Sequence, residues 1–175
     1  MILQVFLNLS QKELPIDIST GEHVHHPQHG IGKIQSVRKR SFYGLDEATY
    51  AQLYFKRDDL TFMLLKEDLP KTVRSLISAS EARKVLQQIK QWDGEPRSQW
   101  KARADAHEAV IEGGNPFEYA KVVKELSKME SADELRPRDR KNLSDTLDLL
   151  EEELTASLNK TAAQTRKLLQ EALTA

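Results

Sequence analysis

The sequence contains no cysteine among its 175 residues. Disulfide frameworks and thiolate zinc sites are therefore excluded, and the chain suits a reducing compartment, so we expect a cytoplasmic protein. The apolar stretch at residues 1–9 has no leading lysine or arginine and is too short to cross a bilayer. The sequence predicts neither a signal peptide nor a membrane span, and we expect no membrane partner.

An excess of charge of either sign is also missing. Lysine and arginine together number 26 and aspartate and glutamate 27, which gives a formal net charge of −1. A protein that holds DNA alone by neutralising phosphates usually presents a much more basic face. Any contact with DNA should therefore be weak and should depend on another macromolecule that brings the chain there.

The sequence offers no nucleophile for catalysis. It has no cysteine, and no serine lies in a Gly-x-Ser-x-Gly elbow. Glu151, Glu152 and Glu153 are adjacent on a predicted helix and point in different directions, so we interpret them as a solvated face rather than as paired acid and base. We predict no enzymatic activity and no cofactor.

Residues 26–34 (HPQHGIGKI) form a corner at the head of a series of short predicted strands. Pro27 restricts φ and donates no hydrogen bond, while Gly30 and Gly32 can adopt positive φ where the chain reverses. A Gly-x-Gly pair that cradles a phosphate needs a strand before it and a helix after it. No amphipathic helix follows here, so we interpret the glycines as turn residues.

Four strands are predicted, at residues 23–26, 32–42, 49–55 and 60–65. Turns containing Gly44 and the pair Asp58-Asp59 separate the later strands. In the third strand, alternate residues from Ala51 to Phe55 are apolar and predict a core face. Such a pattern is typical of small Tudor or SH3-like antiparallel β-barrels, which commonly bind other proteins.

Four of the five histidines lie within seven residues: His23, His25, His26 and His29. On a strand, His23 and His25 would point to the same face. Neutral imidazole is a good zinc or nickel ligand. No cysteine is available, and the neighbouring carboxylate of Glu22 points to the opposite face of the strand. We predict no metal site and interpret these residues as strand and turn histidines, with a metal-responsive module as an alternative.

From residue 79 onward apolar residues recur at helical spacing. The predicted helices begin after the capping box Ser78–Glu81, after Ser98, at Pro116 behind the N-cap Asn115, at Pro137, and at Thr161. The first should end near Gln91 and the second at Gly113-Gly114. The sequence therefore predicts an α+β protein with an N-terminal arm (1–20), a small antiparallel β-barrel (21–78) and an all-α helical bundle of about five helices (79–175).

Two features are candidates for binding. Arg38-Lys39-Arg40 on the second strand, with Leu53 and Met63 on the next two, fits either a binding face or a strand edge beside core residues. Trp100 lies one turn into a predicted helix, where a tryptophan can be either a core anchor or an exposed wedge or stacking platform.

Several motifs resemble those of the CarD/CdnL family. They are Pro27-x-His29-Gly30-Ile31-Gly32, the Gly44 turn, Trp100-x-x-Arg103, Gly114-Asn115-Pro116-Phe117-Glu118-x-Ala120-x-Val122-Val123-x-x-Leu126, and Leu149-Leu150-x-x-Glu153-Leu154. The resemblance runs from about Gly21 to the end of the chain. It implies a bacterial transcription regulator whose Tudor-like domain binds the RNA polymerase β subunit. The helical domain would place a tryptophan in the DNA minor groove at the upstream edge of the promoter bubble and stabilise the open complex.

The resemblance also implies site residues. Arg40, Leu53 and Met63 would bind the polymerase. Trp100 would be the wedge in promoter DNA, and Arg103 and Arg140 would be basic contacts to it. The protein is expected to act as a monomer, without a metal.

The sequence departs from the family pattern beside the tryptophan, where Ala102 and Asp105 replace basic residues. His26 and Leu65 replace a tyrosine and a proline, and Arg136-Pro137-Arg138 replaces a serine-containing helix start. The alternative function is therefore a divergent CarD-like protein that binds polymerase but uses its helical domain for a protein partner rather than promoter DNA.

Overall fold

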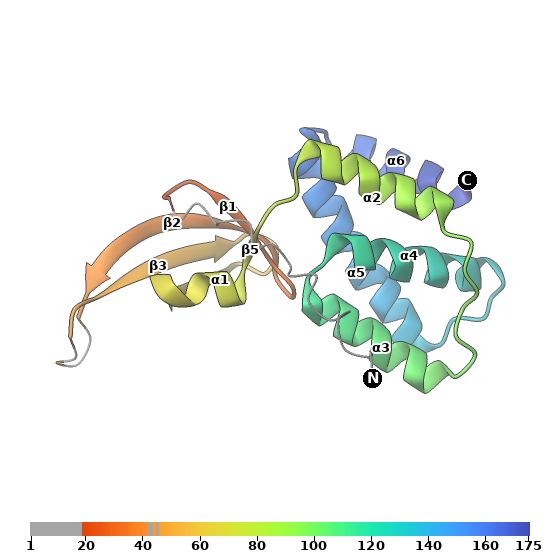
Figure 1. The fold of residues 1–175 in the computed structure, drawn as a ribbon, viewed down its shortest axis with the longest axis horizontal. Helices are drawn as coiled ribbons and strands as arrows, with labels where there is room; N and C mark the ends of the chain where they lie inside the picture. The colour runs from red at the N-terminus through yellow and green to blue at the C-terminus, as the bar shows by residue number, and fades with distance from the viewer. Residues whose placement is uncertain (1–18, 42–43, 45) are drawn as a thin grey trace, which may run out of the picture.

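The computed structural model describes residues 19–41, 44 and 46–175, which form a β-sheet region followed by a helical region (Figure 1). The sheet region, here the β domain, contains β1 (His23–His26), β2 (Gly30–Arg40), β3 (Ala48–Phe55), β4 (Leu60–Leu65), a 3₁₀ turn (Lys66–Asp68), α1 (Leu69–Thr72) and β5 (Arg74–Ser75). The helical domain contains α2 (Ala79–Gln91), α3 (Trp100–Gly113), α4 (Pro116–Ser131), α5 (Pro137–Leu158) and α6 (Ala162–Thr174). These elements confirm the predicted fold class.

The β domain is a five-stranded antiparallel sheet in the order β4-β3-β2-β1-β5. Its core contains the alternate β3 residues, together with side chains from β1, β2 and α1: Val24, Ile34, Ala51, Leu53, Phe55, Leu69 and Val73. Gly32 faces this core, because a Cβ there would lie 2.6 Å from the Phe55 ring. The structure adds β5 and α1, which the sequence analysis did not predict; a two-residue strand is too short to show a period.

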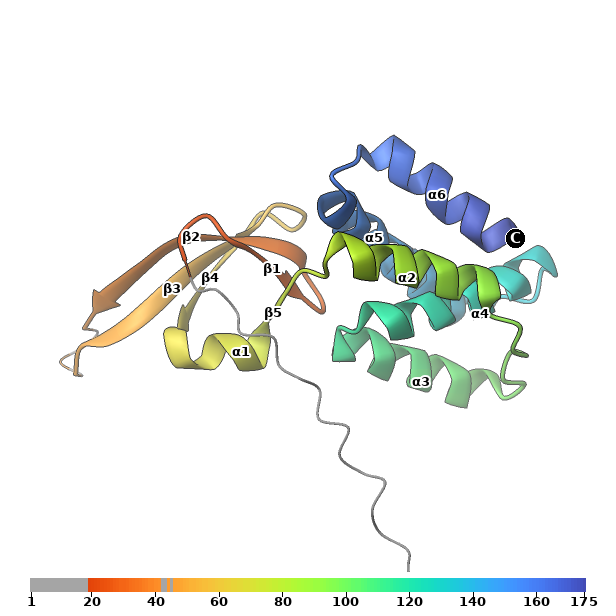
Figure 2. The ribbon, with the colours of Figure 1, turned by 45° about the horizontal axis from the view of Figure 1, so that its top comes forward.

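The helical domain is built around α5, which packs on each of the other four helices α2, α3, α4 and α6 (Figure 2). Two predicted N-terminal caps are present. Ser78 Oγ accepts a bond from Glu81 N in a full capping box, and Asn115 Oδ1 accepts one from Phe117 N. The predicted cap at Ser98 is wrong, because Gln99 precedes α3 and makes no side-chain cap bond.

The two domains meet where two of the family-like motifs come together. Gly114 ends α3 with a φ of +71°, and a Cβ on it would lie 3.0 Å from Cγ of Pro27. Gly30 has a φ of +69°, and a Cβ there would lie 2.0 Å from Oε2 of Glu152 on α5. Both positions therefore need glycine, for backbone conformation and for close approach between domains.

The acidic run on α5 corrects one prediction. Glu153 is fully buried and Glu152 is half-buried, so this run is not the expected solvated face. Adjacent helical residues point about 100° apart, which turns Glu151 towards Arg166 of α6, Glu152 towards Ile31 of the β domain, and Glu153 into the domain interface. Burial raises the pKa of Glu152 above its ordinary value.

The substitution Gly30→Ala is expected to lower the free energy of unfolding by about 1–3 kcal/mol. The new Cβ would strain the backbone and would displace the Glu152 carboxylate from the Ile31 N–H. Urea denaturation measures the change. Gly44→Ala is the control, since Gly44 also has a positive φ but no atom lies within 4 Å of its Cβ position; equal losses for the two variants would contradict the interface contact.

Candidate functional site

Two of the three residues expected to bind polymerase lie on the outer face of the sheet. Arg40 pairs with Ala48, and alternate residues along β3 lead to Gln52, which pairs with Met63 on β4. Because directly paired residues share a face of a sheet, Arg40 and Met63 lie on the same face. Arg40 is exposed and Met63 is 40% exposed.

Leu53 differs from that expectation. Its side chain is fully buried in the β-domain core, because it lies one residue from Gln52 and therefore points through the opposite face. Leu53 packs in the core beneath β3, and its side chain has no exposed surface for a partner to contact. The partly exposed Gln52, directly opposite Met63, takes its place on the outer face.

Strand β4 lies at an edge of the sheet. Within the part of the chain that the structure describes, β3 pairs with one side of β4 and no strand pairs with the other. An edge strand presents backbone N–H and C=O groups to which an extended segment of another protein can pair. Met63 therefore lies where both side-chain and backbone contacts to a partner can form.

A second exposed surface lies where α3 and α5 begin. Trp100 is the first residue of α3 and is 49% exposed, which excludes the core-anchor interpretation. The start of α5 is held beside it, since Arg103, one turn along α3, pairs with Asp139 on α5. Three exposed basic residues lie at or near the two helix starts: Lys101 follows Trp100 on α3, Arg136 precedes α5, and Arg140 is in the first turn of α5.

Arg103 is held inside the helical domain. Its side chain is 3% exposed and donates from Nη2 to Asp139 Oδ2 at 2.6 Å and from Nε to Oδ1 at 3.2 Å. Burial would raise the pKa of Asp139, but the bonds from Arg103 and from the Arg136 N–H lower it more. The expected contact between Arg103 and a DNA phosphate therefore conflicts with this geometry, and Arg103 instead fixes the two helix starts.

Asp105, one of the departures from the family pattern, also binds a basic residue. Arg138 Nη2 donates to Asp105 Oδ1 and to Glu108 Oε2, each at 2.7 Å. This bridge between α3 and α5 satisfies a guanidinium that would otherwise add to the basic surface near Trp100. The charge of Arg138 is therefore balanced by two carboxylates within the helical domain.

The four clustered histidines do not converge. His23 is exposed, while the rings of His26 and His29 lie 4.6 Å apart beside Phe55 and Phe62. His29 Nδ1 is 2.6 Å from Asp58 Oδ2, and this bond lowers the pKa of Asp58. Among residues 19–41, 44 and 46–175, no three His, Cys, Asp or Glu side chains gather as metal ligands would.

His25 is buried in the domain interface. Its ring lies beside Tyr119 of α4, with Nε2 4.0 Å from Glu153 Oε2. Neither ring nitrogen has a hydrogen-bond partner within the described part of the chain. Burial, and then the charge of Arg74, lower the pKa of His25 from 6.5 to about 2. The carboxylate of Glu153 does not prevent this shift, because it is bonded to Arg74.

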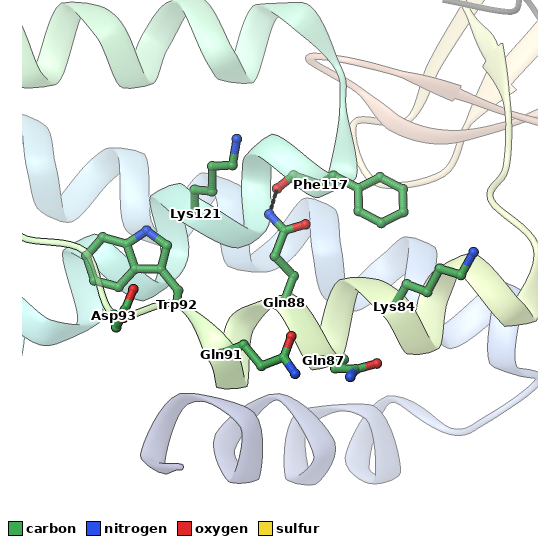
Figure 3. Close-up of a pocket in the computed structure, with 8 residues that line it drawn as sticks. All are labelled: Lys84, Gln87, Gln88, Gln91, Trp92, Asp93, Phe117 and Lys121. Carbon is green, nitrogen blue, oxygen red and sulfur yellow. Dashed lines mark hydrogen bonds between the residues drawn. The ribbon is translucent and has the colours of Figure 1, made fainter.

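A groove of about 540 Å³ lies between α2 and α4 (Figure 3). It is lined by Lys84, Gln87, Gln88, Gln91, Trp92, Asp93, Phe117 and Lys121. Gln88 crosses it and donates to the Phe117 carbonyl at 2.8 Å. The lining is amide-rich and exposed, with no convergent acid, base or nucleophile, so the groove does not suggest a catalytic centre.

The family profile described as "CarD, C-terminal domain" matches residues 84–170, which span α2 to α6. The chain belongs to the CarD/CdnL family. The resemblance read from the sequence is thereby confirmed. A search of curated proteins gives no match. Membership makes this a CarD-like, transcription-related protein of a non-enzymatic family and indicates interaction with RNA polymerase. In the described residues of this CarD-like protein, no helix has both the length and the apolar character of a membrane span.

The interdomain pairing of Glu153 with Arg74 was not predicted from the sequence. The charge of Glu153 suggested solvent exposure, yet it accepts bonds from Arg74 in the domain interface. The available signal was its place within the motif Leu149-Leu150-x-x-Glu153-Leu154, where apolar residues surround it. Arg74 carried no comparable signal, because it lies between the last predicted strand and the first predicted helix.

The buried His25 predicts a dependence of stability on pH. Its folded pKa is below its unfolded value, so stability is fully present above pH 6.5 and is lost as the pH falls towards about 2. Between pH 6.5 and 5.5 the wild type should lose about 1 kcal/mol more unfolding free energy than His25→Phe. Denaturant titrations at the two pH values measure this. The same loss in both proteins would show that His25 is not the responsible group.

Proposed function

We propose that this CarD-like protein docks on the β subunit of bacterial RNA polymerase through the outer face of its sheet and stabilises the promoter open complex with Trp100. The observation that carries the proposal is the exposed Trp100 at the start of α3, in a domain that matches the CarD family. An aromatic ring at the end of a rigid helix can enter the DNA minor groove and unstack a base step.

The outer face of the sheet supports the polymerase contact. Arg40 and Met63 share this face, and β4 offers a free edge within the described residues. An exposed methionine and an exposed arginine on one face suit an interface, where both residue types are enriched. The buried Leu53 contributes by supporting β3 rather than by touching the partner.

Modest charge around Trp100 fits a DNA contact that depends on polymerase. Unstacking a base step costs about a few kcal/mol, and the segment after Trp100 is not strongly basic, since Ala102 and Asp105 follow it. Docking on polymerase would raise the effective concentration of Trp100 at the promoter, which can offset that cost without a strongly basic protein. Arg140 is exposed on α5 and is the stronger candidate for a phosphate contact, since Arg103 is already paired.

A second candidate function is a helical domain that binds a protein partner instead of DNA. The pairing of Arg103 with Asp139, and of Arg138 with Asp105, favours it because both guanidinium groups are already satisfied within the domain. Trp100 would then be an anchor in a protein interface. The two candidates differ in whether Trp100 alters the lifetime of the open complex.

The substitution Met63→Glu is expected to weaken binding to the polymerase β subunit at least about tenfold, which corresponds to about 1.4 kcal/mol. A carboxylate at this position would replace apolar contact on the outer face. Surface plasmon resonance with immobilised polymerase measures the affinity. Lys71→Glu, which changes an exposed charge on α1, is the control. Equal affinities for both variants and the wild type would exclude this face as the contact.

The substitution Trp100→Ala is expected to abolish the increase in open-complex lifetime while leaving polymerase affinity unchanged. The lifetime is measured on one promoter with purified bacterial polymerase, as decay after addition of a competitor. Gln99→Ala is the matched control, because Gln99 is an exposed neighbour that makes no cap bond. If the wild type leaves the lifetime unchanged while still binding polymerase, the protein-partner function replaces the proposal.

A further inference from the structure

The strongest contact between the two domains of the CarD-like protein is a two-point ion pair. Arg74, on β5, donates from Nη1 to Glu153 Oε1 at 2.5 Å and from Nη2 to Oε2 at 2.8 Å. Glu153 is on α5 in the helical domain and is fully buried. A planar guanidinium bound at two points to a planar carboxylate fixes direction as well as distance.

Further bonds surround this pair and reach three segments of the helical domain. Arg74 Nε donates to the Gly114 carbonyl at the end of α3, at 2.7 Å. Glu153 Oε1 also accepts from the N–H of Ile77, at 3.1 Å, in the link that leads to α2. Arg74 and Glu153 therefore fasten β5 to α5, to the end of α3 and to the link before α2.

The position of the pair suits control of domain orientation. Only residues 76–78 separate β5 from α2, and a link of that kind leaves rotation free unless other contacts prevent it. Trp100 begins the same helix, α3, whose last turn is held by Arg74 through Gly114. The bond between Arg74 and Gly114 therefore connects the β domain to the helix that begins with Trp100.

We propose that Arg74 and Glu153 are positioning residues: they lock the two domains in one orientation, so that a β domain docked on polymerase holds Trp100 at its target. The proposal rests on the proposed function. A positioning role gives a reason for the burial of Glu153, whose two carboxylate oxygens both accept hydrogen bonds. Loss of the lock would leave both surfaces intact but would lower the effective concentration of Trp100 at the promoter.

Arg74→Lys is the first test variant. Lysine keeps the positive charge but cannot bind both carboxylate oxygens and the Gly114 carbonyl with a fixed planar group. Glu153→Gln is the second variant, because it keeps the shape and removes the charge. Arg166→Lys is the matched control, since Arg166 pairs with Glu151 at 2.7 Å on the same helix but belongs to α6. Circular dichroism and thermal melting establish that each variant is folded.

Three quantities are measured for each protein: polymerase affinity, open-complex lifetime, and the distance distribution between spin labels on the two domains. The absence of natural cysteine allows labels at two exposed positions away from the proposed polymerase face, Lys71→Cys on α1 and Ala109→Cys on α3. For Arg74→Lys and Glu153→Gln we expect affinity within twofold of the wild type, loss of most of the lifetime increase, and a broadened distance distribution. Arg166→Lys should match the wild type in all three.

The outcomes separate this proposal from the proposed function. A narrow, wild-type distance distribution in both test variants overturns the lock, whatever the lifetime. A broad distribution with an unchanged lifetime shows that orientation does not matter, and also overturns it. If the wild type itself leaves the lifetime unchanged, the proposed function fails; the positioning role then fails with it, while the distances still report whether the pair orients the domains.

Discussion

A carboxylate buried between two domains has to be neutralised and hydrogen-bonded, and this requirement governs the arrangement of the CarD-like protein. Glu153 has no exposed surface and is bonded to the guanidinium of Arg74 and to a backbone N–H of the interdomain link. Such a pair adds little net stability, because both ions lose their hydration, but removing one partner alone typically costs about 3–5 kcal/mol. Its main contribution is therefore to fix one geometry.

The close approach of the two domains also requires glycine at two positions of the interface. Gly30 lies against Glu152 and Gly114 lies against Pro27, with no room for a side chain in either place. Pro27, Gly30 and Gly114 belong to the sequence motifs that resemble the family. Their close packing at the domain interface explains why the motifs contain these residue types. They bring the first corner of the β domain onto the end of α3 and the C-terminal half of α5.

Much of the fold follows from local patterns. Alternation in β3 and capping at Ser78 and Asn115 depend on residues close in sequence, so they could be predicted. Other features depend on contacts between segments that are distant in sequence: the burial of Glu153 and the pairing of Arg103 with Asp139. The inward direction of Leu53 depends on which alternate residues of β3 face the core. For the candidate site, the sequence named Met63 and Trp100 as binding candidates but left each open between a buried and an exposed position. The structure shows that both side chains are exposed, because exposure depends on how distant segments pack.

The central claim is that the two domains form one rigid body held by Arg74 and Glu153. Backbone ¹⁵N relaxation of the full chain tests it most directly, since it reports the tumbling of each domain separately. The account predicts one rotational correlation time for both domains, that of a 20.0 kDa body, and two shorter, different times for Glu153→Gln. Separate tumbling of the domains in the wild type would contradict it.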